Sequence, residues 1–80
     1  MTRVYVRALQ GQLGPLFNEL LATDGITDVN DAPEDSVWDF VVEVQAEDPE
    51  AVADFLDFLT TKVPGVENAE IAPPPNEEEN

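Results

Sequence analysis

The sequence contains no cysteine and no histidine, and both absences remove whole classes of chemistry. Without cysteine there is no disulfide, no thiolate nucleophile and no zinc–sulfur site. Without histidine there is no serine–histidine pair, and the most common general base is missing. The side chains left for catalysis are carboxylates, Tyr5, Ser36, Lys62 and some threonines. We therefore expect a protein that is not an enzyme and has no cofactor.

Cations and long apolar runs are also scarce. Lys and Arg number 3 against 18 Asp and Glu, which gives a formal net charge of −15 at pH 7. A chain this negative repels phosphates, so we expect neither nucleic acid nor an anionic membrane as a direct ligand. No apolar run approaches the roughly 18 residues of a membrane span, and no secretory signal is recognisable. A cytoplasmic location is the default expectation.

The acidic residues are unevenly distributed along the chain. Residues 1–23 hold two arginines and one acid, Glu19, whereas residues 24–80 hold seventeen acids and Lys62, a local net charge of 1 − 17 = −16. Adaptation to concentrated salt should acidify every exposed surface, but the first predicted helix has a single acid. The uneven distribution favours the interpretation that the acidic residues form a binding surface. The alternative interpretation is adaptation to concentrated salt.

Apolar periodicity predicts six elements. Asp48 is expected to cap the second helix, with Pro49 at its first position. Gly25 and Gly65 follow the two helices, where a residue of positive φ is common. The predicted strands cover residues 2–9, 26–30, 37–46 and 66–71, and the predicted helices cover residues 11–23 and 48–63.

Two sets of side chains are expected in the core. Helical spacing in the first helix predicts one buried stripe. Alternation in the third strand gives Trp38 the same side as Phe40, Val42 and Val44, which predicts that Trp38 is also buried. The stripe of the first helix consists of Leu13, Leu16, Phe17, Leu20 and Leu21.

The element order predicts an α+β, ferredoxin-like βαββαβ fold, in which right-handed crossovers place both helices on one face of a four-stranded antiparallel sheet. We expect a single domain over residues 1–72 and a proline-rich, acidic, disordered tail over residues 73–80.

The first and third strands would be central neighbours in this sheet. On the open face, Arg3 and Arg7 would then lie opposite Glu43 and Asp39 in some order, and opposite charges across strands stabilise modestly. Both arginines would thus be neutralised within the protein, leaving the acids elsewhere uncompensated.

Local motifs carry resemblances to known families. Asp31-Ala32-Pro33, the run from Phe40 to Asp48 and Val63-Pro64-Gly65-Val66 resemble small ferredoxin-like modules. They are similar to the assembly chaperone of periplasmic nitrate reductase and to the ligand-binding domain of leucine-responsive regulators. The segment from Gln12 to Leu16 resembles the first loop of amino-acid-binding ACT domains. The resemblances imply this fold and two functions, a chaperone for a twin-arginine signal peptide or a regulatory module.

The acidic stretch after the second strand resembles a calcium loop in composition alone. A calcium loop needs acids at alternating positions, a central glycine and a terminal glutamate. Ala32 occupies a ligand position and the glycine is missing. We therefore expect a turn here and no metal site.

The interpretation that best explains the asymmetry is a non-enzymatic acidic protein-binding module, a decoy of DNA-mimic type such as a mobile-element anti-defence protein. It would occupy a basic nucleic-acid-binding surface of a partner. One alternative is a regulatory module of ACT or leucine-responsive-regulator type from a salt-adapted organism, forming a homodimer through Tyr5 and Val41 on the open sheet face. Another is a chaperone that binds a basic peptide. The expected partner-binding residues are Asp28, Asp31, Glu34, Asp35, Glu47, Glu50, Asp54 and Asp57.

Overall fold

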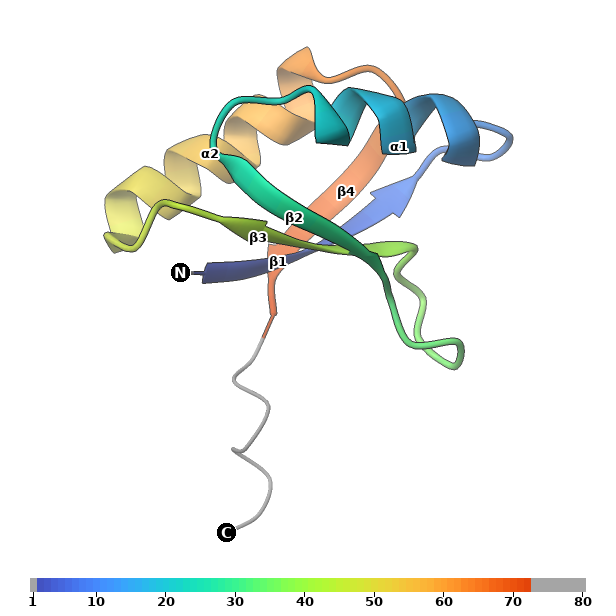
Figure 1. The fold of residues 1–80 in the computed structure, drawn as a ribbon, viewed down its shortest axis with the longest axis horizontal. Helices are drawn as coiled ribbons and strands as arrows, with labels where there is room; N and C mark the ends of the chain where they lie inside the picture. The colour runs from blue at the N-terminus through green and yellow to red at the C-terminus, as the bar shows by residue number, and fades with distance from the viewer. Residues whose placement is uncertain (1, 73–80) are drawn as a thin grey trace, which may run out of the picture.

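A computed structural model describes residues 2–72 and confirms the predicted α+β, ferredoxin-like arrangement. All neighbouring strands are antiparallel in the order β2-β3-β1-β4, and both helices lie on one face of the sheet (Figure 1). The predicted disordered tail, residues 73–80, lies outside the described residues. The elements are β1 (Thr2–Ala8), α1 (Leu13–Leu21), β2 (Ile26–Asp31), β3 (Phe40–Val44), α2 (Pro49–Lys62) and β4 (Val66–Ile71).

The core lies between the sheet and the two helices. Alternate residues of the central strands β1 and β3 point toward the helices and are buried, as the period of two in a strand requires. The helices contribute leucines and valines at helical spacing. The fully buried large side chains are Leu16, Leu20, Leu59, Val4, Val6, Val42 and Val44.

The first and last residues of α2 are determined by local interactions at the two ends of the helix. The side chain of Asp48 accepts a hydrogen bond from the Glu50 N–H (3.2 Å), and Pro49 occupies the first helical position. The predicted cap is thereby confirmed. Beyond the helix, Gly65 has φ +94°, a left-handed conformation that glycine adopts without strain, and it turns the chain into β4.

Both edge strands of the sheet are irregular. The pairing of β2 with β3 shifts its register between Ile26 and Asp28, and the pairing of β1 with β4 shifts between Arg7 and Ala8. Such bulges increase the local twist of a strand and interrupt its ladder of hydrogen bonds. The two central strands pair with each other in unbroken register.

The predicted core position of Trp38 is wrong. The third strand begins at Phe40 rather than at residue 37, because Ser36 forms a turn: its N–H donates to the Pro33 carbonyl (3.1 Å), and its hydroxyl accepts from the Trp38 N–H (3.2 Å). Strand alternation therefore does not extend back to Trp38. Its half-buried ring stacks on Tyr5, with ring centroids 5.7 Å apart.

The predicted buried stripe of α1 is only partly correct. Leu16 and Leu20 are buried, but Leu13, Phe17 and Leu21 are 51 %, 37 % and 56 % exposed. With 3.6 residues per turn, the five side chains spread over about 140° of the helix circumference. The helix rests on the sheet along the Leu16–Leu20 side of that arc, so the other three side chains remain exposed.

Candidate binding surfaces

The acids predicted on the second helix share one exposed surface. Glu50, Asp54 and Asp57 lie at positions i, i+4 and i+7 of α2, a spacing that places them on one side of a helix. We call this set the α2 acidic face. Glu47 is exposed just before the helix begins.

Three of the remaining predicted acids form a second group at the other end of the strands. Asp31, Glu34 and Asp35 are exposed in the last position of β2 and in the following turn. The five residues of β3, about 16 Å of strand, separate this turn from the start of α2. Figure 1 shows the β2–β3 connection and the amino-terminal end of α2 at opposite ends of the molecule. The structure thus divides the predicted acids between two regions.

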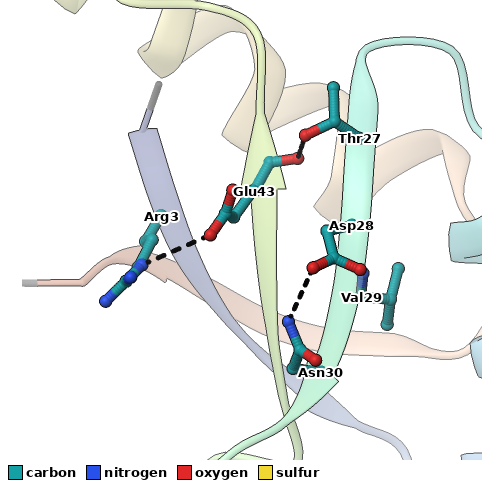
Figure 2. Close-up of polar contacts among 6 residues, drawn as sticks. All are labelled: Arg3, Thr27, Asp28, Val29, Asn30 and Glu43. Atoms are coloured by element: carbon teal, nitrogen blue, oxygen red, sulfur yellow. Dashed lines mark hydrogen bonds and ion pairs between the residues drawn. The ribbon is translucent and has the colours of Figure 1, made fainter.

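Asp28 is held by its own strand. One carboxylate oxygen accepts from the Val29 N–H (3.0 Å), and the other accepts from the side-chain amide of Asn30 (3.1 Å), as Figure 2 shows for Asn30. Asp28 lies opposite Glu43 in the pairing of β2 with β3. Its carboxylate is therefore oriented by the edge of the sheet and does not belong to the turn.

Both arginines pair with glutamates on the open sheet face. Arg3 lies 3.6 Å from Glu43, its cross-strand neighbour on β3 (Figure 2), which confirms that expectation. Arg7 pairs instead with Glu67 of β4, at 3.4 Å. The carboxylate of Asp39 is engaged elsewhere, because it accepts a hydrogen bond from the Ala8 N–H (2.8 Å).

An aromatic pair lies on the open sheet face between the two arginines of β1. Tyr5 and Val41 are direct cross-strand partners, and both are half-buried. The stacked ring of Trp38 makes this surface larger than the sequence predicted. Ser36 and Asp39, both frequent in turns, are the signal in the sequence that could have placed Trp38 outside the strand.

The carboxylates of the α2 acidic face are exposed to solvent. None of the charged side chains within residues 2–72 is buried, and no group of three acids in that range is arranged to hold a metal ion. Exposed carboxylates attract cationic groups of other molecules.

The structure also reveals a hollowed surface of mixed apolar and polar lining that the sequence did not predict. Two adjoining hollows of about 620 and 590 Å³ lie where the first turns of α1 face the β2–β3 connection, and Leu13 and Asp39 line both. We call this surface the α1 groove. Its apolar lining includes Leu9, Leu13, Phe17, Val37, Trp38 and Phe40.

No protein-family model matches the chain, and no curated protein matches it. Neither helix of the described part of the chain is both long and apolar enough to cross a membrane.

Proposed function

We propose that the protein is a non-enzymatic acidic module that binds a basic protein surface, and that this surface normally binds nucleic acid. The observation that carries the proposal is the exposed and uncompensated charge of the α2 acidic face. Two of the three cations, Arg3 and Arg7, pair with carboxylates of the sheet. The third, Lys62, lies in the last turn of α2, beyond Glu50, Asp54 and Asp57.

The sign and the linear arrangement of this face support a DNA-mimic mode of binding, whereas its spacing is wider than that of phosphates. At 1.5 Å per residue, Glu50, Asp54 and Asp57 are about 6 and 4.5 Å apart along the helix axis. One strand of DNA presents a phosphate about every 3.4 Å. The face imitates the sign and the linear arrangement of a strand at lower density. A basic groove would accept it through charge-assisted hydrogen bonds, with fast association that weakens as salt rises.

Two triple variants with the same charge change test the proposal. The first, Glu50→Gln/Asp54→Asn/Asp57→Asn, neutralises the α2 acidic face. The second, Glu19→Gln/Asp24→Asn/Glu70→Gln, removes three exposed acids that lie on other elements. Each variant is immobilised and exposed to a lysate of the source organism at about 0.15 M salt, where the Debye length is about 8 Å. Captured proteins are eluted with duplex DNA.

We expect the native protein and the second variant to retain nucleic-acid-binding proteins that duplex DNA releases. The first variant should lose most of this capture, because each charge-assisted contact contributes more than a neutral one. Equal loss in both variants would mean that total charge, rather than the α2 acidic face, controls binding. Captured proteins that duplex DNA fails to release would contradict the decoy mechanism. Circular dichroism of both variants verifies that the fold is intact.

A further inference from the structure

The α1 groove exposes large apolar side chains on a protein with a strongly negative net charge. Leu9 and Val37 are 45 % and 66 % exposed, and Leu13 and Phe17 of α1 also line the groove. Apolar side chains rimmed by polar groups are characteristic of interaction sites.

The wall of the groove opposite α1 is held by hydrogen bonds. The Ala32 N–H donates to the Asp39 carbonyl (3.1 Å), which closes the β2–β3 connection at its base. The Ser36 hydroxyl donates to the Pro33 carbonyl (2.9 Å), which fixes its tip. A wall ordered in this way loses little conformational entropy when a ligand binds.

The rim of the groove is negative. Its charged lining consists of four carboxylates and one cation, and Arg7 pairs with Glu67 while the Asp39 carboxylate accepts from the Ala8 N–H. Asp31 and Glu34 are the exposed carboxylates that remain for an occupant. An occupant with cationic side chains beside its apolar ones would complement both parts of this surface. A second copy of the chain would bring another formal charge of −15 to the interface. The four carboxylates belong to Asp31, Glu34, Asp39 and Glu67.

The shape of the α1 surface favours a helical occupant. Leu13 and Phe17, one turn apart on α1, line the groove, and side chains at this spacing form a ridge of the kind that packs against a second helix. Amphipathic helices bind apolar grooves through anchors at similar spacing.

We propose that the α1 groove docks a cationic amphipathic helix of a partner protein. The apolar side of that helix would contact Leu13, Phe17 and Val37, and its Lys and Arg side chains would meet the acidic rim. The proposal rests on the proposed function in one respect, the basic nature of the partner. It adds a second contact surface that depends on apolar burial.

Trp38 gives a fluorescence signal beside the groove, because it is the only tryptophan in the chain, it contributes to the lining, and its ring stacks on Tyr5. Calorimetry measures the affinity directly. Three peptides of equal length and positive charge, all without Trp and Tyr, serve as probes. The first is an amphipathic Leu/Lys helix, the second has the same composition in an order without an apolar side, and the third is oligolysine with neutral Gly–Ser spacers. Trp38 fluorescence and calorimetry are followed in parallel at about 0.15 M salt.

A double variant and a matched control separate apolar docking from ionic binding. Leu13→Ser/Phe17→Ser removes two side chains of the groove. The control, Phe58→Ser/Ile71→Ser, removes side chains of similar size that are 41 % and 52 % exposed and line neither hollow. Val37→Ser, at an exposed position of the connection, is a third variant that leaves the helix unchanged.

We expect the amphipathic helix to bind at least about tenfold more tightly than the other two peptides and to change Trp38 fluorescence. The groove double variant and Val37→Ser should weaken this binding, and the control should not. Equal affinity of all three peptides, unaffected by Leu13→Ser/Phe17→Ser, would overturn the groove proposal and leave the ionic function standing. If no peptide binds at about 0.1 mM, the groove proposal fails and the proposed function loses support as well.

Discussion

Asp39 connects three parts of the molecule. Its carboxylate accepts from the Ala8 N–H at the end of β1, its own N–H donates to the Val6 carbonyl (2.9 Å), and its carbonyl accepts from Ala32. The same residue lines both hollows of the α1 groove. One half-buried residue therefore links the end of β1, through its side chain and its N–H, to the wall of the candidate binding surface, through its carbonyl.

Replacing Asp39 by alanine should destabilise the protein, even though the change reduces the net negative charge. The Ala8 N–H would lose its partner in a partly buried position, which costs about 1–3 kcal/mol. Asp35→Ala is the control, because it removes the same charge from an exposed position of the same connection. Urea unfolding should give a free energy of unfolding at least about 1 kcal/mol lower for Asp39→Ala than for Asp35→Ala. Equal values would show that the hydrogen bond contributes nothing measurable.

At the scale of elements, the sequence predicts the structure correctly where a single hydrophobic periodicity extends over a whole segment. The order of the six elements, the cap of α2 and the pairing of β1 with β3 all follow from alternation, helical spacing and capping chemistry. The prediction is wrong where local hydrogen bonds interrupt the periodicity, as at Ser36. It is only partly correct where part of an apolar arc packs against the sheet and the rest stays exposed, as in α1. The α1 groove depends on both of these departures, so periodicity alone could not have revealed it.

The glycine that follows α2 should not tolerate alanine. At Gly65, a Cβ would impose a side chain on φ +94° and would lie 3.4 Å from the Cβ of Leu16. We expect the free energy of unfolding to fall by about 1–2 kcal/mol, because left-handed backbone is unfavourable for residues other than glycine. Urea unfolding of Gly65→Ala beside the native protein measures the difference, and a neutral substitution would contradict the role of this turn.

For the whole molecule, the role of the negative charge can be judged from the balance between repulsion among the carboxylates and the stability that core packing provides. Residues 2–72 carry fifteen acids and three cations, a net charge of 3 − 15 = −12. Repulsion of this kind opposes the compact state and is screened by salt. A protein whose acids serve binding must nevertheless remain folded at moderate salt, where ionic contacts with a partner are still strong.

Thermal melting from about 0.01 M to about 1 M salt tests this balance, since the Debye length falls from about 30 Å to about 3 Å over that range. We expect a folded protein throughout, with a Tm that rises by about 5–10 °C as the repulsion is screened. Glu19→Gln/Asp24→Asn/Glu70→Gln should flatten the dependence by reducing the charge. Unfolding of the native protein in dilute buffer would instead identify the acidity as an adaptation to concentrated salt.

The bulges in the two edge strands have a consequence for how the protein meets other chains. Regular, uncharged edges are templates on which foreign strands add, and they promote edge-to-edge aggregation. Here β2 and β4 each carry an interrupted register together with acidic side chains, among them Asp28 on one edge and Glu70 on the other. Both edges thus lack the regular, uncharged ladder on which a foreign strand adds most readily.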